Sequence, residues 1–254
     1  MKKVDDMQAQ IPEHVSITLV TTMHPGNIGA SARAMKTMGV KQLDLVAPNG
    51  FPGAEVTARA SGADDILAQV RIFENLAAAT SDCGYVLGTS ARTRNIRWPL
   101  ISPEQAARQV LEQAHAGTPV AILFGTERTG LSNADLELCH AVIAIPANPG
   151  FSSLNLAAAV QIVCYELRKA AMAKVVTTST PVSATSAATG EQMQLFYQQL
   201  EQYLRDVGFY HPGKPRLLMR RLKRMFNRIQ LDQSEYNLLR GILAAADKAG
   251  KDNS

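Results

Sequence analysis

The sequence predicts an α/β fold, built on a Rossmann-like and mostly parallel sheet, followed by a small C-terminal helical domain. Strand-like and helix-like segments alternate between residues 15 and 170, as they do in such sheets. The later strand-like segments, such as 120–125, are apolar throughout, which indicates strands buried on both faces with helices on either side. Loops rich in small residues follow several strands, at the edge where open α/β sheets bind ligands.

Each predicted element follows from its own pattern, with β-branched runs for strands and apolar residues at helical spacing for helices. The predicted strands are 15–20, 42–46, 70–73, 85–90, 120–125 and 141–145. The predicted helices are 30–38, 54–67, 75–79, 103–116, 133–139 and 154–170. Gly39 is expected to end the first helix, and Ser152 and Ser153 are N-cap residue types before the last one.

The composition changes after residue 173, which divides the chain into parts. Residues 1–14 are expected to be loose, 15–173 to form the sheet domain, 174–190 to be a flexible linker, and 191–250 to form basic helices. The middle helix of the last part carries a dense basic stripe, comprising Arg216, Arg220, Arg221, Lys223, Arg224 and Arg228. Such a stripe indicates contact with RNA phosphates, although a solvated helix face would have the same composition.

The overall composition argues against a membrane protein, a secreted protein and a protein held together by disulfides or a metal. The formal net charge is +4, and no apolar run reaches the length of a membrane span. The first residues lack the apolar core of a signal peptide. The three cysteines, Cys83, Cys139 and Cys164, lie far apart without a C-x-x-C pair, so neither a disulfide framework nor a metal site is expected. A cytoplasmic protein fits these features.

Two loops carry candidate chemistry. Residues 125–132 look like a phosphate loop, but Leu131 stands where the P-loop requires lysine, so an NTPase is rejected. Glu127 and Arg128 in that loop are either a surface ion pair or a pair facing a ligand pocket. Residues 145–156 place a polar cluster between a buried strand and a buried helix, where backbone N–H groups are free. An ordinary strand, loop and capped helix would have the same pattern.

Three motifs together resemble those of the SPOUT class of RNA methyltransferases. The motifs are Asn27-x-Gly29 with Arg33-Ala34, Leu123-Phe124-Gly125-x-Glu127-x-x-Gly130, and Ile145-Pro146 with Ser153-Leu154-Asn155. The resemblance covers residues 15 to about 170. Further segments, 89–92, 98–99, 148–156 and 237–243, are similar to members that methylate the ribose 2′-hydroxyl of cytidine or uridine at position 32, the first nucleotide of the tRNA anticodon loop.

The resemblance, rather than the periodicity, implies a deep trefoil knot in the C-terminal part of the sheet domain. It also implies a homodimer with the active site at the subunit interface, and bent S-adenosylmethionine in the knotted loops. The residues implied for the cofactor are Thr89, Ser90, Ala91, Leu123, Gly125, Gly130, Ile145, Ser152, Ser153 and Leu154. Gly125 is expected to let the backbone approach this ligand closely.

Arg33 is implied as the main catalytic residue, with Asn27, Glu127, Ser153 and Asn155 around it. A guanidinium stays protonated in proteins, so Arg33 is better suited to hold a substrate phosphate while that phosphate or a water takes the proton. Two alternatives stay open at this point. One is the same chemistry on another tRNA or ribosomal RNA site, and the other is a non-catalytic RNA-binding protein, against which the intact motif residues argue.

Overall fold

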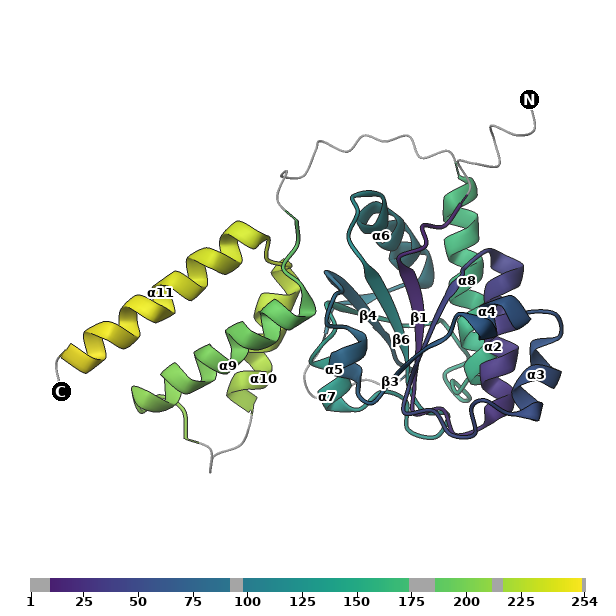
Figure 1. The fold of residues 1–254 in the computed structure, drawn as a ribbon, viewed down its shortest axis with the longest axis horizontal. Helices are drawn as coiled ribbons and strands as arrows, with labels where there is room; N and C mark the ends of the chain where they lie inside the picture. The colour runs from purple at the N-terminus through teal and green to yellow at the C-terminus, as the bar shows by residue number, and fades with distance from the viewer. Residues whose placement is uncertain (1–9, 92–97, 174–185, 212–216, 253–254) are drawn as a thin grey trace.

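The computed structural model describes residues 10–91, 98–173, 186–211 and 217–252, with the side chains of 249–252 excepted. It contains a sheet domain and a helical unit that lies beside it (Figure 1). None of the helices in these ranges is both long and apolar enough to cross a membrane.

The sheet has seven strands, and every pairing between them is parallel. The strands are β1 (Val15–Val20), β2 (Gln42–Val46), β3 (Arg71–Phe73), β4 (Tyr85–Thr89), β5 (Leu100–Ile101), β6 (Val120–Phe124) and β7 (Ala141–Ile143). Their order is β3-β2-β1-β6-β4-β7-β5, so β7 lies between the two earlier strands β4 and β5. The predicted parallel α/β sheet is confirmed, and β5 is an addition that the sequence pattern did not predict.

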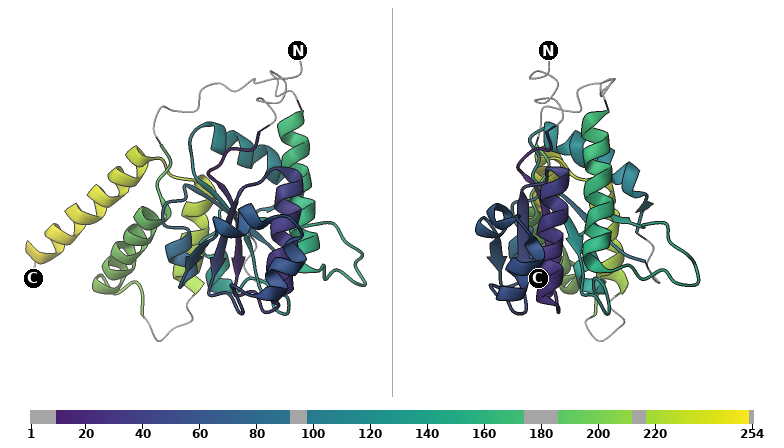
Figure 2. Two further views of the ribbon diagram at one scale, coloured as in Figure 1. Left: turned by 45° about the vertical axis from the view of Figure 1, so that its right-hand side comes forward. Right: turned by 90° about the vertical axis from the view of Figure 1, so that its right-hand side faces the viewer.

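Helices cover both faces of the sheet. They are α2 (Pro25–Met38), α3 (Ala54–Ala60), α4 (Asp64–Ala68), α5 (Leu76–Ala79), α6 (Pro103–His115), α7 (Asn133–Leu136) and α8 (Leu156–Met172). Alternate residues of β6 show the two layers, because Ile122 and Phe124 pack with α2, α6 and α8, whereas Ala121 and Leu123 pack with α5 and α7. Helices α2 and α8 lie side by side on the first face (Figure 2).

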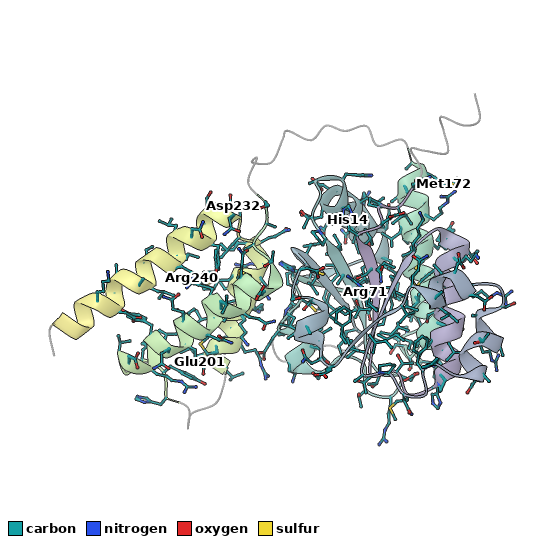
Figure 3. The ribbon with its side chains drawn as sticks, viewed as in Figure 1. His14, Arg71, Met172, Glu201, Asp232 and Arg240 are labelled. Atoms are coloured by element: carbon teal, nitrogen blue, oxygen red, sulfur yellow. The ribbon has the colours of Figure 1, made fainter. Side chains whose placement is uncertain are left out.

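The buried carboxylate of Asp44 within the sheet is held by three hydrogen bonds. The carboxylate of Asp44 on β2 is fully buried and accepts hydrogen bonds from Nε and Nη2 of Arg71 on β3, each at 2.8 Å. Figure 3 labels Arg71. Gln42 donates a third bond to this carboxylate at 2.9 Å. The bidentate pair lets β2, the strand next to the edge strand β3, carry a carboxylate that would otherwise be costly to bury.

Three of the differences between predicted and observed helix boundaries have a clear local reason. Helix α2 begins at Pro25, because proline at the first position loses no helical hydrogen bond, and this places Asn27 in the first turn. The predicted helix 54–67 is broken at Ser61 and Gly62, whose φ values are +45° and +89°. Helix α8 begins at Leu156 and is capped by the side chain of Asn155, not by Ser152 or Ser153.

The C-terminal unit consists of α9 (Gly190–Asp206), α10 (Leu217–Ile229) and α11 (Gln233–Asp252). It has its own small core, in which Phe196 and Phe226 meet edge to face with ring centroids 4.9 Å apart. Arg240 of α11, labelled in Figure 3, donates to Gln199 of α9 at 3.1 Å. Within the predicted linker, residues 174–185 lie outside the described residues, whereas Ala188 already pairs with Leu231 through a backbone hydrogen bond of 2.9 Å.

Candidate functional site

A pocket opens at the carboxyl ends of β4, β6 and β7, in the middle of the sheet. Four chain segments line it, namely 89–91, 124–130, 143–145 and 152–159. Nine of the ten residues implied for the cofactor are part of this lining, and they are Thr89, Ser90, Ala91, Gly125, Gly130, Ile145, Ser152, Ser153 and Leu154. The structure therefore brings together residues that are up to 65 positions apart in the sequence.

Leu123 is the tenth residue, and it does not line the pocket. Its side chain is fully buried in the second layer of the core, with Leu131 and Val142. Its backbone carbonyl accepts a hydrogen bond from the Thr89 hydroxyl at 2.9 Å. Leu123 thus fixes the orientation of a pocket residue on the neighbouring strand, and its side chain belongs to the core.

Gly125 has no room for a side chain, because the chain itself packs closely against it. The loop after β6 folds back on itself, with the N–H of Gly130 bonded to the carbonyl of Thr126 at 2.9 Å. A Cβ atom at Gly125 would lie 2.1 Å from the backbone of Gly130 and Leu131. The glycine is therefore required by the packing of this loop within the chain.

A network of three side chains adjoins the pocket and centres on Glu127. Its Oε1 accepts from the Asn27 amide at 2.8 Å and from the N–H of His24 at 3.2 Å, while Oε2 accepts from the N–H of Met23 at 3.0 Å. Burial by itself raises the pKa of this carboxyl, but the hydrogen bonds outweigh it and hold the pKa below its usual value. Glu127 is consequently ionised at neutral pH, and its lone pairs are already engaged.

Asn155 extends this network to the start of α8. Its Nδ2 donates to Oδ1 of Asn27 at 3.0 Å, and its Oδ1 accepts from the N–H of Ala158 at 3.2 Å. One residue thus caps α8 and joins it to α2. The resulting chain of bonds from Glu127 through Asn27 to Asn155 fixes the two helix starts relative to the loop after β6.

Arg33 and Ser153 are placed differently from the other three implied catalytic residues. Ser153 lines the pocket and is exposed to solvent. Arg33 is exposed on α2 and is absent from the pocket lining, and within the described ranges its side chain has no hydrogen bond or ion pair. The structure therefore gathers Asn27, Glu127 and Asn155 in one network and leaves Arg33 apart from it.

The basic stripe on α10 faces two ways. Arg220 and Lys223 point toward the sheet domain and bind the carboxylate of Glu137, at 2.5 and 3.2 Å. Arg221 and Arg228 are exposed, Arg224 is partly buried, and Arg216 lies outside the described residues. Two of the predicted RNA-binding cations are thus engaged within the chain. The sequence carried no signal for this, because Glu137 is 83 residues away from Arg220.

Further hydrogen bonds fasten the same junction. The Asn227 amide of α10 donates to the backbone carbonyls of Glu137 and Cys139 at 2.9 and 3.3 Å, and it is held by the Tyr197 hydroxyl. The N–H groups of Gly190 and Glu191, at the start of α9, donate to the carbonyls of Cys83 and Ser81. The helical unit is therefore docked on the sheet domain through polar contacts from two of its helices.

The three cysteines are free and buried, and burial raises the pKa of each thiol above its usual value. In the part of the chain that the structure describes, no group of three His, Cys, Asp or Glu side chains is placed to hold a metal ion. The polar side chains that line the pocket are the hydroxyls of its serines and threonines and the charged groups of Glu127 and Arg128.

Comparison with known families matches both parts of the chain. Residues 14–165 match the model of the SpoU rRNA Methylase family, and residues 191–254 match that of the tRNA methyltransferase TrmJ, C-terminal domain. The tRNA (cytidine/uridine/adenosine-2′-O-)-methyltransferase TrmJ of Pseudomonas aeruginosa is 46% identical over 94% of this chain and 96% of its own. The tRNA (cytidine/uridine-2′-O-)-methyltransferase TrmJ of Sodalis glossinidius is 43% identical over 94% and 93%.

Two solved structures are similar over nearly the whole chain. TrmJ from Z. mobilis ZM4 superposes with a TM-score of 0.80 at 36% identity, and the match covers 93% of this chain and 99% of that one. A probable methylase family protein from Haemophilus influenzae Rd KW20 has a TM-score of 0.62 at 38% identity, covering 95% and 99%. Both the sheet domain and the helical unit are thus found together in known structures.

Proposed function

The chain belongs to the SpoU methylase family and carries a TrmJ-type C-terminal domain, and from this premise we propose that it methylates a ribose 2′-hydroxyl of tRNA with S-adenosylmethionine. The observation that carries the proposal is the pocket at the ends of β4, β6 and β7, which adjoins the Glu127 network. The names of full-length relatives at 43% and 46% identity supply the reaction and the substrate class.

The pocket residues suit the proposed cofactor. Ile145, Leu154 and Leu156 offer apolar contacts for an adenine ring, and the segments 89–91 and 124–126 offer backbone polar groups beside it. When bound, S-adenosylmethionine supplies an activated methyl group on a sulfonium. The protein then has to position the hydroxyl and help to remove its proton.

Glu127 acts as a positioning residue in this proposal. With three hydrogen bonds and a lowered pKa, its carboxylate is a poor proton acceptor. It holds Asn27, which in turn holds Asn155, and it thereby keeps the helix starts of α2 and α8 at the mouth of the pocket. The exposed Ser153 hydroxyl is free in this arrangement to bond the substrate ribose.

Arg33 cannot accept the proton of the 2′-hydroxyl, because a guanidinium remains charged. It holds a phosphate of the RNA instead, and that phosphate or a water accepts the proton. Since Arg33 does not line the pocket of its own chain, it serves the pocket of a second copy in a homodimer. Membership of the family also implies the trefoil knot, with which the insertion of β7 between β4 and β5 agrees. A tRNA-modifying enzyme of this kind works in the cytoplasm.

The helical unit, residues 191–250, supplies phosphate contacts in this proposal. Arg221 and Arg228 are exposed on α10 and suited to bind phosphates directly, with Arg216 and Arg224 beside them in the sequence. Phosphate contacts dominate affinity for nucleic acids and weaken with added salt. The unit would thus hold the body of the tRNA while the sheet domain acts on the target ribose.

We propose position 32 of the anticodon loop, occupied by cytidine or uridine, as the target. The test incubates the full chain with a tRNA transcript and S-adenosylmethionine, and maps the methylated nucleotide by mass spectrometry of nuclease fragments. A matched transcript with 2′-deoxycytidine at position 32 should accept no methyl group. Methylation of a different nucleotide would contradict position 32 as the target. Binding of tRNA without methyl transfer would favour the non-catalytic alternative.

A further inference from the structure

The loop between β7 and α8 projects from the body of the sheet domain (Figure 2). A tight turn shapes its tip, because the side-chain oxygen of Asn148 accepts from the N–H of Gly150 at 2.9 Å. The backbone carbonyl of Asn148 accepts from the N–H of Phe151, also at 2.9 Å. Phe151 therefore stands at the end of a defined turn, and part of the entropic cost of holding it for a ligand is already met.

The ring of Phe151 is open to solvent. It is 79% exposed, the highest value among the large apolar side chains that the structure describes. The three residues that follow it, Ser152, Ser153 and Leu154, line the pocket. An aromatic ring left in water at the rim of a ligand pocket forgoes favourable burial, which points to a partner that covers it.

We propose that Phe151 stacks on an unpaired base of the RNA substrate and so positions the target ribose. This inference rests on the proposed function. The ribose must enter the pocket that residues 152–154 line, and a base is bonded directly to that ribose. Bases of a tRNA loop can be splayed out, and aromatic side chains stack on them regardless of sequence. Phe151 is the aromatic residue adjacent to those pocket residues, so the base of the target or of its neighbour comes within its reach.

The first test compares full-length Phe151→Leu and Phe151→Tyr in methyl transfer to a tRNA transcript. Leucine keeps an apolar side chain but cannot stack, so kcat/KM for tRNA should fall about 5- to 150-fold, the range of a lost base-aromatic stack. Tyrosine should keep activity near that of the wild type. Ile72→Thr is the matched control, since Ile72 is 57% exposed on the edge strand β3, and it should change nothing.

Two further measurements separate stacking from other roles of Phe151. Calorimetry should show unchanged affinity of Phe151→Leu for S-adenosylmethionine, and sedimentation should show an unchanged molecular mass. A loss of cofactor affinity that matches the loss of activity, or a change from dimer to monomer, would overturn the proposal. The latter would assign Phe151 to contact with a second copy of the chain. If the wild type itself fails to methylate tRNA, the proposed function fails instead.

Fluorescence gives a direct signature of the stack. The chain has a single tryptophan, Trp98, which is buried, so Phe151→Trp adds one exposed reporter. Addition of tRNA should quench the fluorescence of Phe151→Trp more than that of the wild type, and a fully paired RNA duplex should not. Equal quenching of the two proteins by tRNA, or full activity of Phe151→Leu, would overturn the proposal.

Discussion

Removal of the Glu137 carboxylate should loosen the docking of the helical unit on the sheet domain. In Glu137→Ala, Arg220 and Lys223 lose their shared anionic partner, at a site where their side chains are 28% and 29% exposed. A hydrogen bond to a charged group contributes at least about 1.5 kcal/mol to stability. We use this lower value because both side chains are partly exposed to solvent. Two such bonds give about 3 kcal/mol, or about a 150-fold change in the docking equilibrium.

Native-state hydrogen exchange measures this change at the junction itself. The amides of Gly190 and Glu191 donate across it to Cys83 and Ser81, so their exchange in Glu137→Ala should accelerate by about two orders of magnitude. Amides inside β1 should be unaffected. Glu104→Ala is the control, because it removes an exposed ion pair with Arg108 within α6, worth well under about 1 kcal/mol. Unchanged protection of Gly190 and Glu191 would refute the reasoning.

The same variant has a consequence for RNA. Arg220 and Lys223 become available to phosphates, so the dependence of log affinity on log salt should steepen by about 1.5 for two new contacts. Catalytic efficiency should nevertheless fall, because the helical unit no longer holds tRNA in a fixed position relative to the pocket. A salt dependence identical to that of the wild type would show that these two cations stay out of reach of RNA.

Three further predictions concern Arg33, the pocket and the core. Arg33→Ala should lower kcat by roughly 100-fold or more in a tRNA methylation assay, with cofactor affinity unchanged in calorimetry, because it removes a cation that holds substrate. Leu154→Asp should weaken S-adenosylmethionine binding by about tenfold or more, whereas Leu154→Met should not, since a carboxylate replaces an apolar pocket wall. Burial lowers the pKa of His140 to about 4, and the Nδ1 of the neutral ring accepts from the N–H of Val86. The unfolded chain therefore binds more protons between pH 6.5 and 4, so the free energy of unfolding should fall by about 2 kcal/mol on going from pH 7 to pH 5, and His140→Asn should flatten this dependence in thermal melts.

Each of these has an outcome that would contradict it. Wild-type turnover by Arg33→Ala would remove that residue from the reaction. Unchanged cofactor affinity in a folded Leu154→Asp protein, checked by circular dichroism, would move the ligand elsewhere. A stability that stays constant between pH 7 and pH 5 would show that His140 accepts a proton without unfolding.

Much of the fold follows from local patterns in the sequence. The strands β1, β2 and β6 are apolar or β-branched runs closed by turns, and their predicted bounds agree with the structure within one residue. By contrast, β5 has two residues, too few for any periodicity, and its partner β7 lies about 40 residues later. The break at Ser61 and Gly62 was missed because the apolar spacing continues across it.

The sequence identified most residues of the site, but not the hydrogen bonds between them or the role of each. The motif residues Asn27, Glu127 and Asn155 do meet, but the bonds from the backbone of Met23 and His24 to Glu127 span about 100 positions and are not visible in a sequence. Gly125 lines the pocket, where a close approach of the ligand stays a prediction, and the structure adds a neighbour that the sequence could not show, the backbone of Gly130 and Leu131. Asn155 has two roles, as a helix cap and as a partner of Asn27, and the spacing of residues could not separate them.

The place of β7 between β4 and β5 bears on how the protein is made. β4 pairs with β6 on one side and with β7 on the other, and β5 pairs with β7. During synthesis one edge of β4 stays unpaired until residue 143 has emerged, and at about 5 to 20 residues per second this lasts several seconds. An open apolar edge is a template for pairing with other chains. We therefore expect nascent chains that stall before β7 to aggregate, and chaperones that cover strand edges to raise the yield of soluble protein.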